Sequence, residues 1–239
     1  DYQESAPLSK QLQNIDTLLL ISANDLNGRA LLHKNVINAA KNAGIKWIIY
    51  TSLLHADSTT LGLAKDHTDT EKAIRESGIP YTILRNGWYT ENYTGSIPAA
   101  LKNGAFKGCA SNGKISSASR SDYADAAVAV LTGLNQQGRV YELAGDTAFT
   151  LSELAAEVTK LSGKNVPYKN MTEKEYSEVL IKSGLPGAYA KAVASWDTSA
   201  SRGDLFDDSH ELSRLIGRAT TPMHETVLNV IEHDIHQVV

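Results

Sequence analysis

The sequence predicts an α/β protein in which parallel strands form one doubly wound sheet with helices on both faces. Short apolar runs alternate with longer segments of helical periodicity through the first half of the chain. These apolar runs lack alternating polar positions, which is typical of strands buried on both faces of a parallel sheet. Strands that alternate with helices form βαβ units, and right-handed crossovers place the helices on both faces.

Each element of the first half follows from a local signal. Apolar runs predict strands, apolar residues spaced three and four apart predict helices, and Gly44 and Gly78 each end a helix. The predicted strands cover residues 18–21, 46–51 and 81–84, and the helices between them cover residues 32–43 and 64–77.

The second half is predicted to be mostly helical. Helices begin at two Thr-x-x-Glu capping boxes, Thr150–Glu153 and Thr172–Glu175, and at Thr221-Pro222, where a threonine N-cap precedes a proline in the first helical position. Further helices are expected at residues 91–103 and 122–131, and short strands at residues 114–117, 140–143 and 166–168. We therefore divide the chain into residues 1–150 and a mostly helical lobe, residues 151–239, interleaved with the first part.

Composition excludes several classes of protein. Apolar residues make up 42% and charged residues 21% of the 239 positions, the net charge is −4, and no block of Lys and Arg suggests nucleic-acid binding. Cys109 is the single cysteine, which excludes an internal disulfide and fits a reduced, cytoplasmic setting. The longest apolar run, residues 17–21, is too short to span a bilayer, and no signal peptide is evident. The chain starts without Met, and residues 6–13 resemble the end of an element already under way, so we expect a fragment or a truncated form.

Small polar side chains follow three successive predicted strands. They lie in the stretches Ser22, Ala23 and Asn24 after the first strand, residues 51–55 after the second, and residues 85–89 after the third. Ligands of open α/β sheets bind beyond the carboxyl ends of the strands. Each site alone is better explained as the start of a loop or a helix cap. Three in succession favour a ligand crevice.

Other candidate motifs carry less weight. His67 and Glu71 lie four residues apart on one predicted helix, so the carboxylate could orient the imidazole, although a solvated helix face is the commoner outcome. A third metal ligand is not in view, and His55 is more typical of a surface loop. Hydrolase and phosphoryl-transfer motifs are missing from the sequence. The Gly-x-Gly-x-x-Gly phosphate loop is missing as well, since Gly28 and Gly44 are isolated.

Several stretches in combination resemble the NmrA-like, atypical short-chain dehydrogenase/reductase family. The resemblance extends over essentially the whole chain and is strongest to the bacterial NADPH-dependent quinone oxidoreductases. The stretches are LLIS at 19–22, NVINAA at 35–40, YTSLLHAD at 50–57, YTILRNGWYTEN at 81–92, ASRSDYAD at 118–125, VYELAG at 140–145 and LSRLIG at 212–217. What the family has and this chain lacks is the first βαβ portion, with its glycine loop and a basic residue for the 2′-phosphate.

The resemblance implies a Rossmann-type domain in residues 1–150 and a substrate lobe in residues 151–239. It implies NADPH as cofactor and a quinone as substrate, the cofactor carrying the hydride chemistry. The cofactor-binding residues would be Ser22, Ala23, Asn24, Thr51, Ser52, Asn86, Gly87, Trp88, Tyr89, Thr90 and Glu91. The substrate cleft would be closed by Ala118, Ser119, Arg120, Ser121, Asp122 and Tyr123.

The family reading leaves alternatives open. The usual Tyr-x-x-x-Lys pair is absent, so no catalytic residue is assigned. One alternative is a redox-sensing regulatory protein that binds the dinucleotide without turnover, and another is an inactive truncated form. Without a glycine loop, these 239 residues are expected to bind NADPH weakly. A homodimer is left open, and neither nucleic acid nor a membrane is expected as a partner.

Overall fold

The computed structural model describes residues 2–25 and 28–237, with side chains through residue 233. The chain divides into two compact units that interleave along the sequence. Unit 1 comprises Asp1–Thr59, Leu63–Asn86 and Asp125–Leu143, and unit 2 comprises Thr60–Gly62, Gly87–Ala124 and Ala144–Val239. Residues 87–124 thus group with the C-terminal part, while the functional division at residue 150 stays a prediction.

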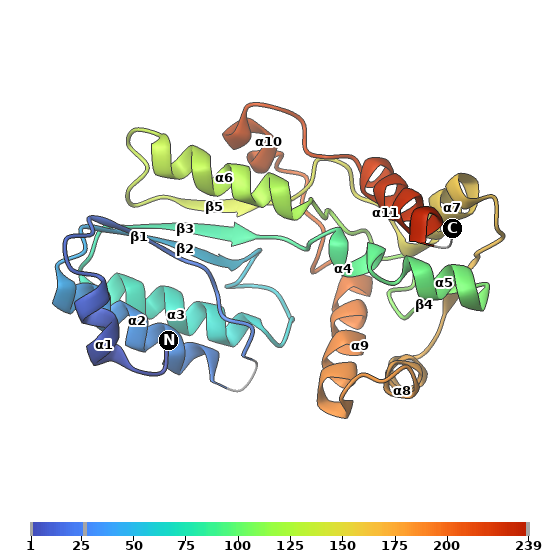
Figure 1. The fold of residues 1–239 in the computed structure, drawn as a ribbon, viewed down its shortest axis with the longest axis horizontal. Helices are drawn as coiled ribbons and strands as arrows, with labels where there is room; N and C mark the ends of the chain where they lie inside the picture. Colours follow the sequence, from blue (N-terminus) through green and yellow to red (C-terminus); the bar gives the residue numbers. More distant parts are fainter. Residues whose placement is uncertain (1, 26–27, 238–239) are drawn as a thin grey trace. The chain divides into compact units, whose positions relative to one another are not determined.

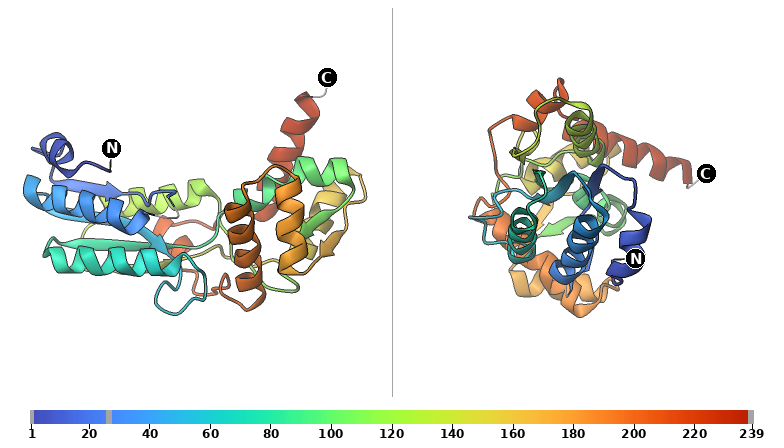
Figure 2. Two further views of the ribbon diagram at one scale, coloured as in Figure 1. Left: turned by 90° about the horizontal axis from the view of Figure 1, so that it is seen from below. Right: turned by 90° about the vertical axis from the view of Figure 1, so that its left-hand side faces the viewer.

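Unit 1 is built on a four-stranded parallel sheet of order β1-β2-β3-β5, which confirms the predicted fold class. The strands are β1 (Thr17–Leu20), β2 (Trp47–Leu53), β3 (Tyr81–Asn86) and β5 (Val140–Leu143). Helices α2 (Arg29–Ala43) and α3 (Ala64–Ser77) cover one face, and α6 (Arg120–Thr132) lies over the other, as Figures 1 and 2 show. The short helix α1 (Ser5–Gln11) packs beside α2.

The core of unit 1 explains its apolar strands. Ile48, Ile49 and Ile83 are fully buried, because helices cover the sheet from both sides. Each buried side chain of this size contributes about 1.5–3 kcal/mol. Gly44 and Gly78 end α2 and α3 with positive φ angles of 79° and 77°, where a side chain would be strained, so the predicted helix ends are confirmed.

Unit 2 is mostly helical, as predicted. Its helices are α4 (Glu91–Thr94), α5 (Ile97–Asn103), α7 (Leu151–Ser162), α8 (Glu173–Lys182), α9 (Gly187–Ser201), α10 (Glu211–Ile216) and α11 (Met223–Gln237). A small parallel sheet joins β4 (Phe106–Gly108) to β6 (Tyr168–Asn170). Helices α8 and α9 pack against each other, and α11 packs on α7 (Figure 1). Both predicted capping boxes are present, at Thr150 and Thr172.

Two expectations for unit 2 need correction. The helix expected over residues 91–103 is broken at Gly95 and Ser96, because Pro98 would clash with the carbonyl group of Thr94 in a continuous helix. The expected strand at residues 114–117 is only an isolated bridge at Ile115. Its neighbour Ser116 donates its N–H to the carbonyl of Leu205, and its hydroxyl to that of Asp207, so no ladder continues.

Two element starts in unit 2 are also displaced. The strand expected at residues 166–168 begins at Tyr168, because Val166 donates its N–H to the hydroxyl of Thr159 instead of joining a ladder. The last helix begins at Met223, one residue after Pro222. The N–H and hydroxyl of Thr221 bond to the carboxylate of Asp122, so Thr221 does not act as the predicted cap.

Among the described residues, no helix is long and apolar enough to cross a membrane.

Candidate cofactor-binding site

The carboxyl ends of β1, β2 and β3 form one edge of the unit 1 sheet. The strands are neighbours and parallel, so Ser22, Thr51 and Arg85 come to the same edge, as the sequence predicts. Ser22 follows β1 by two residues and donates its N–H to Thr51 Oγ1 at 2.9 Å. The strand-end residues of the first two strands are therefore joined directly.

The segment after β1 is also held from helix α2. The N–H of Ala23 donates to His33 Nε2 at 3.0 Å, and Arg29 Nε donates to the carbonyl oxygen of Ala23 at 2.7 Å. Both side chains are buried, and they lie one helical turn apart. Sequence reasoning missed Arg29 and His33. The available signal was two polar residues, four apart, at the start of an otherwise apolar helix face.

His67 and Glu71 fit neither reading of their spacing. Both are buried, so the helix face is not solvated, and neither bonds to the other. His67 Nδ1 lies 2.8 Å from the hydroxyl of Tyr50, and burial together with nearby Arg29 lowers the pKa of His67 to about 3. The neutral imidazole is thus part of a polar network beneath the sheet edge.

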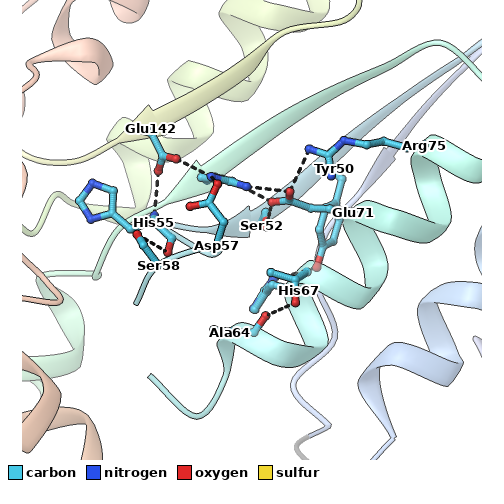
Figure 3. Close-up of polar contacts among 12 residues, drawn as sticks. Tyr50, Ser52, His55, Asp57, Ser58, Ala64, His67, Glu71, Arg75 and Glu142 are labelled. Atoms are coloured by element: carbon cyan, nitrogen blue, oxygen red, sulfur yellow. Dashed lines mark hydrogen bonds and ion pairs between the residues drawn. The ribbon is translucent and has the colours of Figure 1, made fainter. Parts of the chain in front are cut away.

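Arg85 organises a second network, whose acidic members Asp57, Glu71 and Glu142 are labelled in Figure 3. Its guanidinium makes a bidentate ion pair with the carboxylate of Glu71, and both N–O distances are 2.9 Å. It also contacts the carboxylates of Asp57 at 2.9 Å and Glu142 at 2.7 Å. Burial acts to raise the pKa of Glu71, but hydrogen bonds from Arg85 and Ser52 outweigh it and leave that pKa lowered. Arg85 is thereby committed to holding unit 1 together.

Thr51 and Ser52 illustrate how a strand divides its side chains between two faces. The hydroxyl of Ser52 donates to Glu71 Oε1 at 2.7 Å, whereas the hydroxyl of Thr51 accepts the N–H of Ser22. Alternate residues of a strand point to opposite faces. Both positions were assigned to the cofactor, and both stay predictions. The structure gives each hydroxyl a partner within the protein.

Asn86 ends β3 with an unsatisfied acceptor. The residue is 6% exposed, and its Oδ1 is the buried side-chain polar atom without a hydrogen-bond partner within the part of the chain that the structure describes. Buried polar groups are nearly always hydrogen-bonded, and an orphan costs about 1–3 kcal/mol. Its position at the carboxyl end of a parallel strand is where ligands of open α/β sheets bind.

Within unit 2, two segments that sequence reasoning treated separately lie side by side. Ala118 accepts the N–H of Thr90 at 2.9 Å and donates its own N–H to the carbonyl of Trp88 at 3.1 Å. The rings of Tyr89 and Tyr123 meet edge to face with centroids 5.2 Å apart. The structure therefore brings residues 87–91, assigned to the cofactor, against residues 118–123, assigned to the substrate.

The side chains of these two segments differ in how far they are buried. Trp88 is buried against Trp196, whereas the guanidinium of Arg120 lies over the half-buried ring of Tyr89 at 4.2 Å. The backbone N–H of Arg120 donates to the carboxylate of Glu91 at 2.9 Å. Tyr89 and Arg120 thus form a flat cationic and aromatic surface, while Trp88 belongs to the core of unit 2.

Asp122, assigned to the substrate cleft, is fully buried and has several partners. It accepts the hydroxyl of Ser119 at 2.8 Å and the N–H and hydroxyl of Thr221 at 2.9 and 3.0 Å, and it pairs with Arg218 at 2.8 Å. Burial acts to raise its pKa, but these hydrogen bonds leave it lowered. Asp122 therefore ties the start of α6 to the segment before α11. Ser121 beside it is exposed.

Among residues 2–25 and 28–237, no group of three or more His, Cys, Asp or Glu residues is arranged to hold a metal ion.

Comparison with known proteins supports a dinucleotide-related family. A family model described as NAD(P)H-binding matches residues 1–133, which is more than half of the chain. The chain is 55% identical over 227 residues to quinone oxidoreductase 2 of Escherichia coli, covering 95% of this chain and 79% of that protein. It is also 25% identical, over its whole length, to an NmrA-like family domain-containing oxidoreductase of Aspergillus flavus, of which it covers 82%.

Solved structures give the same result. The crystal structure of an NADPH-dependent quinone oxidoreductase from Escherichia coli, complexed with NADPH, superposes with a TM-score of 0.94 and 54% identity, covering 96% of this chain and 81% of that one. The triphenylmethane reductase of Citrobacter, complexed with NADP(H), superposes with a TM-score of 0.92 and 34% identity, covering 96% and 82%. The chain therefore belongs to the NAD(P)H-binding, NmrA-like family.

Proposed function

We propose that this protein is an NADPH-dependent quinone oxidoreductase, which reduces a quinone to a hydroquinone with NADPH and a proton as co-reactants. The observation that carries the proposal is the 54% identity and TM-score of 0.94 to the NADPH complex of such an enzyme. We further propose a reduced, cytoplasmic setting, for which the single cysteine is the support.

The residues present fit a nicotinamide dinucleotide. The sheet edge of unit 1 offers a segment with small side chains, Ser22 and Ala23, and an unpartnered acceptor, Asn86 Oδ1. An amide group of a ligand is a suitable donor to that acceptor. When bound, the reduced nicotinamide supplies the hydride that the reaction needs. We therefore assign Ser22, Ala23, Asn24 and Asn86 to cofactor binding.

The protein's own residues have binding and orienting roles in this proposal. The flat surface of Tyr89 and Arg120 in unit 2 suits the planar, electron-poor ring and the oxygens of a quinone. The ion pair and hydrogen bonds of Asp122, together with the edge-to-face contact of Tyr123, hold residues 118–123 in place. Holding the substrate in a reactive orientation is a substantial part of what such a site must supply.

The first experiment is a spectrophotometric assay of NADPH oxidation with a small benzoquinone. Turnover supports the reductase, whereas NADPH binding without turnover supports a redox-sensing protein, an alternative that the missing Tyr-x-x-x-Lys pair favours. Asn86→Ala should raise the KM for NADPH roughly tenfold if its acceptor meets the cofactor. Asn38→Ala, an exposed change on α2, is the matched control and should behave like the unmodified protein. Equal KM values for both variants would remove Asn86 from the site.

A further inference from the structure

Both backbone polar groups of Ala23 are held by side chains of helix α2. Its N–H donates to His33 Nε2 at 3.0 Å, and its carbonyl oxygen accepts from Arg29 Nε at 2.7 Å. The preceding N–H, that of Ser22, donates to Thr51 Oγ1. Three side chains from two elements therefore hold two successive residues directly after β1, and they do so from the protein's interior.

The hydrogen bonds around His33 determine which of its two ring nitrogens carries the proton. A backbone N–H can only donate, so Nε2 of the ring accepts and the ring proton lies on Nδ1. Nδ1 then donates to Thr70 Oγ1 at 2.9 Å, and the Thr70 hydroxyl donates to the carbonyl of Asp66 at 2.7 Å. The contact with Ala23 therefore needs a neutral imidazole in this one tautomer.

The surroundings of His33 keep it neutral near physiological pH. Burial, and then the charge of Arg29, lower its pKa to about 4. The groups around the ring are Arg29 on its own helix, Thr70 and the neutral His67 on α3, and Tyr50 of β2, whose ring meets that of His33 edge to face at 5.5 Å. The carboxylate of Asp66 pairs with Arg29 at 3.9 Å. The contact to Ala23 should thus be insensitive to pH between 5 and 8.

We propose that His33 and Arg29 are positioning residues for cofactor binding: by holding the backbone N–H and carbonyl of Ala23 from inside, they fix residues 22–24, against which the dinucleotide binds. The inference rests on the proposed function. Ligands of open α/β sheets bind beyond the carboxyl ends of the strands, and a segment already held in one conformation loses less freedom when the ligand binds.

A purely structural role is the competing explanation, because a buried polar network also joins α2 to the sheet. Two substitutions of His33 separate the explanations. The amide of glutamine reaches the position of Nε2, so His33→Gln can still accept the Ala23 N–H. The shorter amide of asparagine reaches the position of Nδ1, so His33→Asn keeps the contact with Thr70 and loses the one with Ala23. Both changes disturb a buried site to a similar degree.

The expected result is a difference in KM between the two variants. His33→Asn should raise the KM for NADPH roughly tenfold, with a smaller change in kcat. His33→Gln should have a KM for NADPH much closer to that of the unmodified protein. Thermal unfolding should show a comparable decrease in Tm for both. If the two variants raise KM equally, in step with their loss of Tm, the positioning role is wrong.

A second measurement does not depend on turnover. In the protein without NADPH, NMR should find the His33 ring proton on Nδ1, and the Ala23 amide should exchange slowly with solvent. Exchange at Ala23 should accelerate roughly tenfold in His33→Asn and much less in His33→Gln. Fast exchange in the unmodified protein would overturn the inference. If the unmodified protein neither binds NADPH nor reduces quinone, the proposed function fails and the cofactor role of His33 fails with it. Turnover with equal behaviour of both variants contradicts the positioning role alone.

Discussion

Replacing Arg85 by methionine tests the ion-pair network of unit 1. Arg85→Met leaves the carboxylate of Glu71, 1% exposed, with only the hydroxyl of Ser52 and one nitrogen of Arg75 as partners (Figure 3). Removing one partner of a buried pair typically costs about 3–5 kcal/mol, because the remaining charge stays buried. We expect Arg85→Met to lower the free energy of unfolding by an amount in that range.

The same carboxylate supplies the control. Arg75 contacts Glu71 Oε2 at 3.1 Å, but its side chain is 41% exposed, so Arg75→Met should cost about 1 kcal/mol or less. Glu71→Gln leaves Arg85 with Asp57 and Glu142, and should cost less than Arg85→Met. In the double variant, Arg85→Met with Glu71→Gln, the loss should be smaller than the two single losses combined, by about 1–3 kcal/mol.

The pH dependence has a defined sign. The folded-state pKa of Glu71 is below its ordinary value of 4.5, so its stabilisation is present above 4.5 and is lost as pH falls through the folded value. Protonation of Glu71 in Arg85→Met relieves the unpaired charge, so the difference from the unmodified protein should narrow in acid. Urea denaturation followed by circular dichroism from pH 4 to pH 8 measures this. Equal losses for Arg85→Met and Arg75→Met, or a pH-independent difference, would refute the reasoning.

Further predictions concern unit 2. Burial raises the pKa of Asp197 from 3.8 to about 6, so the protein loses about 3 kcal/mol of stability as pH rises through that interval. Asp197→Asn should therefore raise the Tm at pH 8 and have little effect on it at pH 4. Gly145→Ala would place a methyl group on the carbonyl of Ser117, so about 1–3 kcal/mol should be lost in urea denaturation, and an unchanged midpoint would contradict the close contact. Thr150→Ala removes the N-cap of α7 and should cost about 1 kcal/mol, measured as a lower Tm; Ser201→Ala, at an exposed helix end, should cost less.

The first half of the chain was predictable because its signals are local. The helix over residues 64–77 was predicted with the bounds that it has, since Gly78 marks its end and periodicity marks its length. The strand at Phe106–Gly108 was missed, because three residues ending in glycine carry no pattern of their own. That strand exists through pairing with Tyr168–Asn170, far along the chain.

For the candidate site, the sequence predicted the position of the backbone segments but not the partners of their side chains. Strand alternation placed Ser22, Thr51 and Arg85 at one edge, but the direction and partner of each side chain depend on elements distant in sequence. The spacing of Glu71 suggested either a pair with His67 or a solvated helix face, whereas its partner Arg85 comes from a strand. Asp122 likewise bonds to residues nearly a hundred positions later. Spacing within one helix cannot identify such partners.

The strength of NADPH binding is a further expectation from the sequence that stays a prediction. These 239 residues contain no glycine-rich phosphate loop, so isothermal titration is expected to find weak NADPH binding. Tight binding would show that the strand-end residues and the unpartnered Oδ1 of Asn86 suffice to hold the cofactor.

The most direct test of the account is NADPH oxidation in the presence of a small benzoquinone, followed by the loss of absorbance of the reduced nicotinamide. The account predicts quinone-dependent oxidation with one hydroquinone formed for each NADPH consumed, and a higher KM for NADPH in Asn86→Ala. Binding of NADPH with no quinone-dependent oxidation, even at saturating cofactor, would contradict the reductase and leave a dinucleotide-binding regulatory protein in its place.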